Sequence, residues 1–258
     1  MCTASTVTPY SGGITAEITL TSPQRRPGRT AARRPPLAAA GVVMVVATVL
    51  GLVLRLYQLT GPGFLLGVTE HDDGVYFGSA VRLVHGVVPY GDFVLVQPPG
   101  IAVLLAPLAW LARATGTGSA LAVARVLTAC AGAAAVPLAG LRVRGKGLLA
   151  TSLTCGVLAV YSAGINAAHT VLLEPWVVLL CLLGMLAIFD GDQLAARPRR
   201  LAWGGAAFGL AAAIKLWALL PVVVLLAVGG RRVRGRAARA YLGGFATAFG
   251  LLLASAPG

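Results

Sequence analysis

The chain consists of long apolar runs separated by short polar stretches. An apolar run of roughly 20 residues is long enough to cross a bilayer as a helix. Runs of about this length lie at 37–57, 119–141, 147–165, 172–189 and 240–257. Another run, 201–229, carries Lys215 and Pro221 near its middle. The pattern predicts an all-α fold, a polytopic transmembrane helical bundle with about seven membrane segments.

Composition agrees with lipid surroundings. Hydrophobic residues make up 57% of the 258 residues and charged residues 11%, whereas about a quarter of a soluble domain is charged. The formal net charge is +13, and such an excess first indicates nucleic-acid binding. Here, however, the basic residues lie in short clusters between the apolar runs, as in membrane proteins. We therefore expect membrane lipids, and no nucleic acid, as partners.

The basic clusters predict how the chain is oriented. They lie at 25–34, 142–146, 197–200 and 231–239, and all four fall in the cytoplasm if the N-terminus is cytoplasmic. Most acidic residues then face outward, namely Glu70, Asp72, Asp73, Asp92 and Glu174. Residues 1–36, rich in Ser, Thr, Pro and Arg, are expected to form a disordered basic tail. Residues 37–258 would form the transmembrane domain of a multi-pass plasma-membrane protein.

Two apolar stretches do not fit simple crossings. The first outer loop, 58–118, contains 98–112, which we interpret as an interfacial or re-entrant helix because a crossing there would move the next basic cluster outside. The run 201–229 has basic clusters at both ends, so we expect a short helical hairpin with Lys215 near its tip. One long tilted helix is the alternative, and it breaks the charge rule. The end at Gly258, directly after an apolar run, is consistent with a fragment or a truncated product.

The outer loop carries the candidate chemistry. Glu70, Asp72 and Asp73 lie within four residues, just after the first apolar run. The following pattern predicts a short amphipathic helix over 75–84 and a turn at 89–92. A carboxylate at the membrane surface can act as a general base, but a run of acids is more often a solvated loop. These residues alone leave both interpretations open.

The order of motifs in this loop resembles that of a known family. Asp-acid-Gly-x-Tyr begins at Asp72, Gly-x-x-Pro-Tyr-x-Asp-Phe at Gly86, and Pro-Pro-Gly ends at Gly100. This resembles the first outer loop of membrane glycosyltransferases of the GT-C fold, closest to the branch of protein O-mannosyltransferases and the lipid A aminoarabinose transferase. Residues 172–176 resemble that family's second acidic motif, and 209–217 resemble its lysine hairpin.

The resemblance implies a reaction and a catalytic residue. It implies transfer of a sugar from a polyprenyl-phosphate donor to a hydroxyl of a lipid, glycan or protein acceptor on the outer face, with inversion. The catalytic carboxylate falls on Asp72 or Asp73. The family usually has Asp-Glu at these positions. This chain has Asp-Asp, so the motif does not distinguish which of the two is the catalytic carboxylate, and we prefer Asp72.

Candidate substrate-binding and phosphate-binding residues follow from the same comparison and from position. Lys215 matches the hairpin lysine, Glu174 matches the second acid, and Gln97 replaces a positive or imidazole residue before Pro-Pro. Position adds three more candidates. Arg125, near the outer end of a span, is a second phosphate ligand, Tyr76 is an aromatic residue that contacts the substrate, and His169 lines the cavity. No cofactor is expected. A divalent ion held by Glu70, His71, Asp72 and Glu174 is the less favoured alternative.

Two other functions compete with this hypothesis. A transporter or flippase could bind a lipid phosphate through Lys215 and Arg125, but transporters tend to show paired repeats, and this sequence shows one broken segment without a second copy. A truncated, inactive relative would keep the fold and lack activity.

Overall fold

The computed structural model describes residues 37–229 and 236–254. These residues are mostly helical, as the all-α prediction requires. The helices are α1 (Leu37–Gln58), α2 (His71–Val84), α3 (Gly100–Thr115), α4 (Thr117–Val143), α5 (Leu148–Val160), α6 (Ser162–Asn166), α7 (Glu174–Ile188), α8 (Pro198–Ile214), α9 (Leu219–Gly229) and α10 (Arg236–Ala254). Two 3-10 turns, η1 (Arg144–Lys146) and η2 (Leu216–Ala218), and a hairpin of β1 (Phe189–Asp190) with β2 (Gln193–Leu194) complete the fold. The predicted disordered tail lies outside the described residues.

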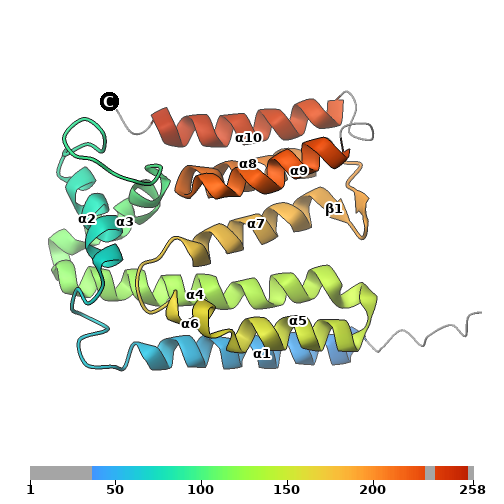
Figure 1. Cartoon of the computed structure of the whole chain (residues 1–258), viewed down its shortest axis with the longest axis horizontal. Helices are drawn as coiled ribbons and strands as arrows, with labels where there is room; N and C mark the ends of the chain where they lie inside the picture. Colours follow the sequence, from blue (N-terminus) through green and yellow to red (C-terminus); the bar gives the residue numbers. More distant parts are fainter. Residues whose placement is uncertain (1–36, 230–235, 255–258) are drawn as a thin grey trace, which may run out of the picture. The chain divides into compact units, whose positions relative to one another are not determined.

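The long helices lie side by side, and successive ones run in opposite directions (Figure 1). Helices α2 and α3 pack together where α1 ends and α4 begins, which we name the α2–α3 end. The β1–β2 hairpin lies at the other end of the same bundle, which we name the β1–β2 end. Both short helices of the predicted outer loop are therefore present, and both lie at one end of the bundle.

Helix α1 exposes an apolar surface on the outside of the helical bundle. Its segment Ala38–Gln58 and the segment Thr117–Lys146 are the two in the described part of the chain that are long and apolar enough to cross a membrane. Only 22% of the α1 window is buried inside the protein, and Val42, Val45 and Val49 are exposed. Lipid accommodates such a face, whereas in water it would be an aggregation-prone patch. Crossing by all seven predicted segments stays a prediction.

The apolar run 201–229 forms a helical hairpin. Helix α8 ends at Ile214, Lys215 takes an extended conformation with φ −148° and ψ 121°, and η2 leads into α9. Pro221 lies in the first turn of α9, where its missing N–H costs no helical hydrogen bond. The break predicted at Lys215 is thus confirmed, and one continuous helix is not. The run 147–165 also breaks, at Tyr161, which separates α5 from α6.

Helices α8 and α10 pack with their backbones in contact. A Cβ placed on Gly209 would lie 2.6 Å from the carbonyl oxygen of Phe245, and one on Gly205 would overlap the carbonyl of Tyr241. Glycine four residues apart on one helix face allows this approach, which is a common packing mode in lipid. The hairpin that carries Lys215 is therefore held closely against α10.

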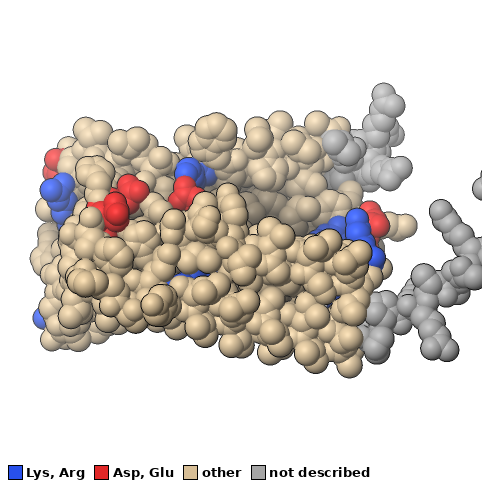
Figure 2. All heavy atoms as spheres, turned by 60° about the horizontal axis from the view of Figure 1, so that its bottom comes forward, with Lys and Arg blue, Asp and Glu red and all other residues tan. Residues whose placement is uncertain are grey.

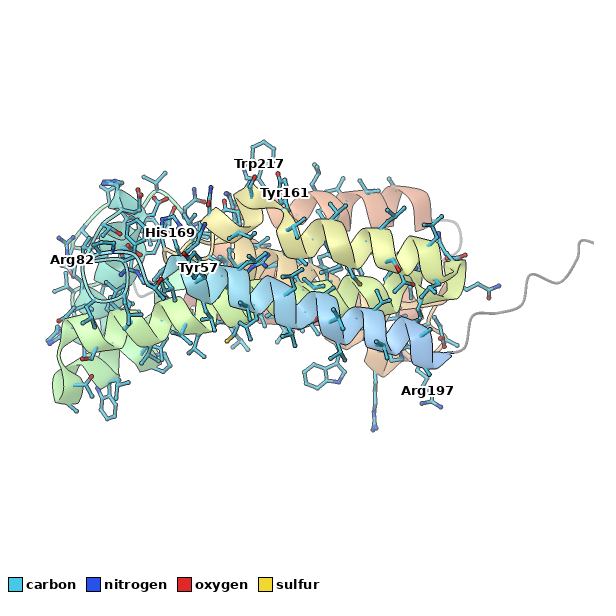
Figure 3. All side chains as sticks on the ribbon, turned by 90° about the horizontal axis from the view of Figure 1, so that it is seen from below. Tyr57, Arg82, Tyr161, His169, Arg197 and Trp217 are labelled. Atoms are coloured by element: carbon cyan, nitrogen blue, oxygen red, sulfur yellow. The ribbon has the colours of Figure 1, made fainter. Side chains whose placement is uncertain are left out.

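Figure 2 shows charged side chains from the left end of the visible face to about its middle and again at the right end, with uncharged atoms between these two groups. At the β1–β2 end, Arg142 donates to the carbonyl of Gly191 at 2.6 Å, and Arg200 donates to that of Leu186 at 2.9 Å. Arg197 lies at this end, and Arg82 lies at the other (Figure 3). Two predicted basic clusters thus meet at the end away from the outer-loop acids.

Candidate functional site

Helix α2 begins earlier than the sequence pattern predicts. It starts at His71 rather than Val75, so Asp72 and Asp73 lie in its first turn and not in a solvated loop. Carboxylates are stabilised there by the helix dipole. Consecutive helical residues point about 100° apart, and accordingly the two side chains differ: Asp72 is half-buried, and Asp73 is buried.

Asp73 forms a buried ion pair with Arg125 of α4, and neither side chain is exposed. The other carboxylate oxygen of Asp73 accepts a hydrogen bond from the backbone N–H of Val171 at 2.9 Å. Arg125 also donates to the carbonyl of Phe64. The pair therefore joins α2, α4, the loop after α1 and the segment before α7. With both charges engaged inside the protein, neither residue is open to a substrate phosphate in this structure.

Glu174 and Lys215 form a second ion pair, at the surface of the α2–α3 end. The Lys215 Nζ atom lies 2.5 Å from Glu174 Oε1, and the side chains are 26% and 47% exposed. Glu174 begins α7, and Lys215 follows the last residue of α8. Their neighbours Leu173 and Ile214 belong to one hydrophobic cluster, which brings the two helix ends together.

The Pro-Pro-Gly motif fixes the start of α3 beside this pair. A Cβ on Gly100 would overlap the carbonyl group of Ala213, two residues before Lys215. Glycine is required because the two backbones touch. Gln97, three residues before Gly100, is half-buried, and its carbonyl accepts a 2.5 Å hydrogen bond from Tyr90.

The charges of carboxylates on α2 and α7 both act on Tyr76. It lies one turn after Asp72 and packs in the same hydrophobic cluster as Leu173 and Ile214. Burial raises the pKa of the Tyr76 hydroxyl, and the carboxylates of Asp72 and Glu174 raise it further. The hydroxyl thus keeps its proton and lies near both acids. We name Asp72, Tyr76, Glu174 and Lys215 the acid–lysine cluster.

A sequence model of glycosyltransferase family 87 matches residues 96–257. The chain belongs to this family. No curated protein and no solved structure matches the chain. Membership confirms the expected membrane glycosyltransferase at the level of the family, while the O-mannosyltransferase or aminoarabinose-transferase branch stays a prediction. The family 87 match includes Glu174 and Lys215 and begins downstream of Asp72.

His169 lies apart from the acid–lysine cluster of this family 87 chain. Its Nε2 atom is 3.9 Å from Glu70 Oε1, and its ring packs against Phe64 with centroids 5.3 Å apart. Figure 3 shows His169 and Tyr57 where the α2–α3 end joins the bundle. Among the described residues, no three His, Cys, Asp or Glu side chains gather closely enough to hold a metal ion. The predicted substrate role of His169 stays a prediction.

Two basic residues have roles that sequence reasoning missed. Arg82 forms no ion pair with an acid in the described part of the chain, and its guanidinium lies 5.0 Å from the centre of the Phe93 ring. Buried Arg55 donates to the carbonyls of Gly51 at 2.8 Å and Leu158 at 3.3 Å. It thereby satisfies the C-terminal end of α5, a role that basic residues commonly play. An arginine in the last turn of an apolar helix was the available signal.

Proposed function

We propose that this family 87 protein transfers a sugar from a polyprenyl-phosphate donor to an acceptor hydroxyl at the outer face of the plasma membrane. One observation carries the proposal. The charges of Asp72 and Glu174 both act on the Tyr76 hydroxyl, and Glu174 is paired with the partly exposed ammonium of Lys215, at the end of the bundle away from two arginine clusters. A base and a phosphate-binding cation are the two groups that such a transfer needs.

Asp72 takes the proton of the acceptor hydroxyl. The oxygen then attacks the anomeric carbon from the side opposite the lipid phosphate, so the configuration inverts as the bond to the phosphate breaks. Lys215 compensates the negative charge of the departing phosphate. Tyr76, which keeps its proton, donates a hydrogen bond to a substrate oxygen. The burial of Asp73 supports Asp72 as the base of the two.

The charge distribution supports a multi-pass topology with the N-terminus in the cytoplasm. Arg142 and Arg200 lie at the β1–β2 end, and basic residues favour the cytoplasmic side. The acid–lysine cluster then faces outward, where a lipid, glycan or protein acceptor would meet the donor. The proposed reaction uses neither a metal nor another cofactor.

The test compares turnover by matched acid variants. The protein is purified into lipid nanodiscs and offered polyprenyl-phosphate sugars with candidate acceptors, and released polyprenyl phosphate is measured. Loss of a general base should slow release by about 10²–10⁴-fold in Asp72→Asn. Asp92→Asn, an exposed acid of the same loop, should keep the wild-type rate. Equal turnover in Asp72→Asn and wild type would remove Asp72 from the mechanism. Lipid binding without turnover would favour the transporter or an inactive relative.

A further inference from the structure

The charges of the Glu174–Lys215 ion pair bear on whether the site binds the donor phosphate or the product phosphate more tightly. The donor of the proposed reaction is a phosphodiester with one negative charge. The lipid product is a phosphate monoester, which carries −1.5 to −2 near neutral pH because its second pKa is about 6. A site that binds the product more tightly than the donor would be blocked after each turnover.

We propose that Glu174 makes this phosphate site discriminate against the doubly charged product, so that Lys215 holds the donor and releases the lipid monophosphate. The inference rests on the proposed function, because the donor and product are those of that reaction. Glu174 is then a specificity-determining residue, and its carboxylate need not touch the substrate.

The geometry of the pair supports this role. Lys215 Nζ is 2.5 Å from Glu174 Oε1, so any phosphate that contacts the ammonium lies within a few ångströms of a negative carboxylate. Both side chains are partly exposed, so a ligand can approach the ammonium without unfolding the protein. The Asp73–Arg125 pair differs, because both of its side chains are inaccessible. Of these two ion pairs, Glu174–Lys215 is the one whose charges can interact with the charge of a bound ligand.

The surroundings of the pair add further negative charge. The charges of Asp72 and Glu174 both act on the Tyr76 hydroxyl, and Tyr76 packs with Ile101 and Leu105 of α3 in one hydrophobic cluster. The Glu70 carboxylate lies 3.9 Å from His169 Nε2, and no hydrogen bond or ion pair in the described part of the chain joins it to Glu174 or Lys215. Lys215 is therefore the one cation shown in contact with Glu174 among the described residues. Because Glu174 already offsets the charge of Lys215, each additional negative charge on a ligand adds repulsion from the carboxylate.

The expected size of the discrimination follows from Coulomb's law. With an effective dielectric constant of about 50, between that of a protein surface and that of water, a full extra charge about 5 Å from a carboxylate changes affinity by roughly tenfold. Wild-type protein should therefore bind a singly charged diester about tenfold more tightly, relative to the monoester, than Glu174→Gln does. The difference should vanish near pH 5.5, where the monoester carries about one charge.

The experiment measures binding of two probes to the full chain in nanodiscs, polyprenyl monophosphate and polyprenyl methyl phosphate, at pH 7.5 and pH 5.5. Glu174→Gln should gain more affinity for the monophosphate than for the methyl phosphate at pH 7.5 and gain equally for both at pH 5.5, and Glu174→Asp should keep the wild-type discrimination. Glu70→Gln removes an acid at the same end and should change nothing. Lys215→Met should weaken both probes.

Three results would overturn the inference. These are an equal gain for both probes in Glu174→Gln at pH 7.5, the same unequal gain in Glu70→Gln, and an unequal gain that persists at pH 5.5. If Glu174→Gln fails to fold, Glu174→Asp must still keep the wild-type preference for the diester and Lys215→Met must still weaken both probes, and failure of either would overturn the inference. Binding needs no turnover, so discrimination in a protein that transfers no sugar would refute the proposed function and leave this inference standing.

Discussion

The two adjacent aspartates of α2 should respond very differently to the same chemical change. Asp73→Asn keeps the oxygen that accepts from the N–H of Val171 but leaves Arg125 as an uncompensated buried charge. Breaking a buried ion pair in this way costs about 3–5 kcal/mol. Asp72→Asn changes a half-buried side chain outside any ion pair of the described residues and should cost within about 1 kcal/mol. Both variants lose the same first-turn interaction with the helix dipole, so the difference isolates the pair.

Thermal unfolding in nanodiscs, followed by circular dichroism at one heating rate, measures this difference. At about 2–4 °C per kcal/mol for a chain of this size, Asp73→Asn should lower the Tm by roughly 6–20 °C and Asp72→Asn by less than about 4 °C. Replacing Arg125 by Met in the Asp73→Asn background should recover part of the loss, because the stranded charge is gone. Similar Tm values for the two Asn variants would refute the reasoning.

Three other outcomes test separate contacts. Gly100→Ala, which forces a Cβ into the carbonyl of Ala213, should lower stability by about 1–3 kcal/mol. Gly78→Ala, which has open space at its Cβ, should raise stability slightly, and unfolding scans compare the two variants. The pKa of Tyr76 in the folded protein is raised above about 10. The stability that its protonated hydroxyl contributes is therefore complete below pH 10 and is lost as the pH rises further. Tyr76→Phe should make the decline of Tm between pH 9 and 11 less steep. A membrane-impermeant maleimide should label Asp92→Cys in intact cells and spare Asp192→Cys, and the reverse pattern would contradict the proposed orientation.

Much of the fold could be predicted from hydrophobic runs and charge placement. The break at Lys215 was predictable because basic clusters flank a run too short for two full crossings. The break at Tyr161 was not, because the run 147–165 contains neither a charged residue nor a proline. Contacts between helices depend on residues far apart in sequence, such as Gly209 against Phe245 or Arg142 against Gly191. No periodic pattern encodes those pairings.

The choice between Asp72 and Asp73 shows where sequence reasoning about the site failed. With a helix start at Val75, both acids belong to a loop and nothing separates them. With the start at His71, Asp73 lies on the buried face of α2 with Phe77 and Ala80, four and seven residues later, while Asp72 lies off it. The phase of the apolar stripe, extended back by one turn, therefore contained the answer. What it did not contain was the partner: a buried carboxylate requires a cation, and Arg125 lies on a helix that the sequence alone could not place beside α2.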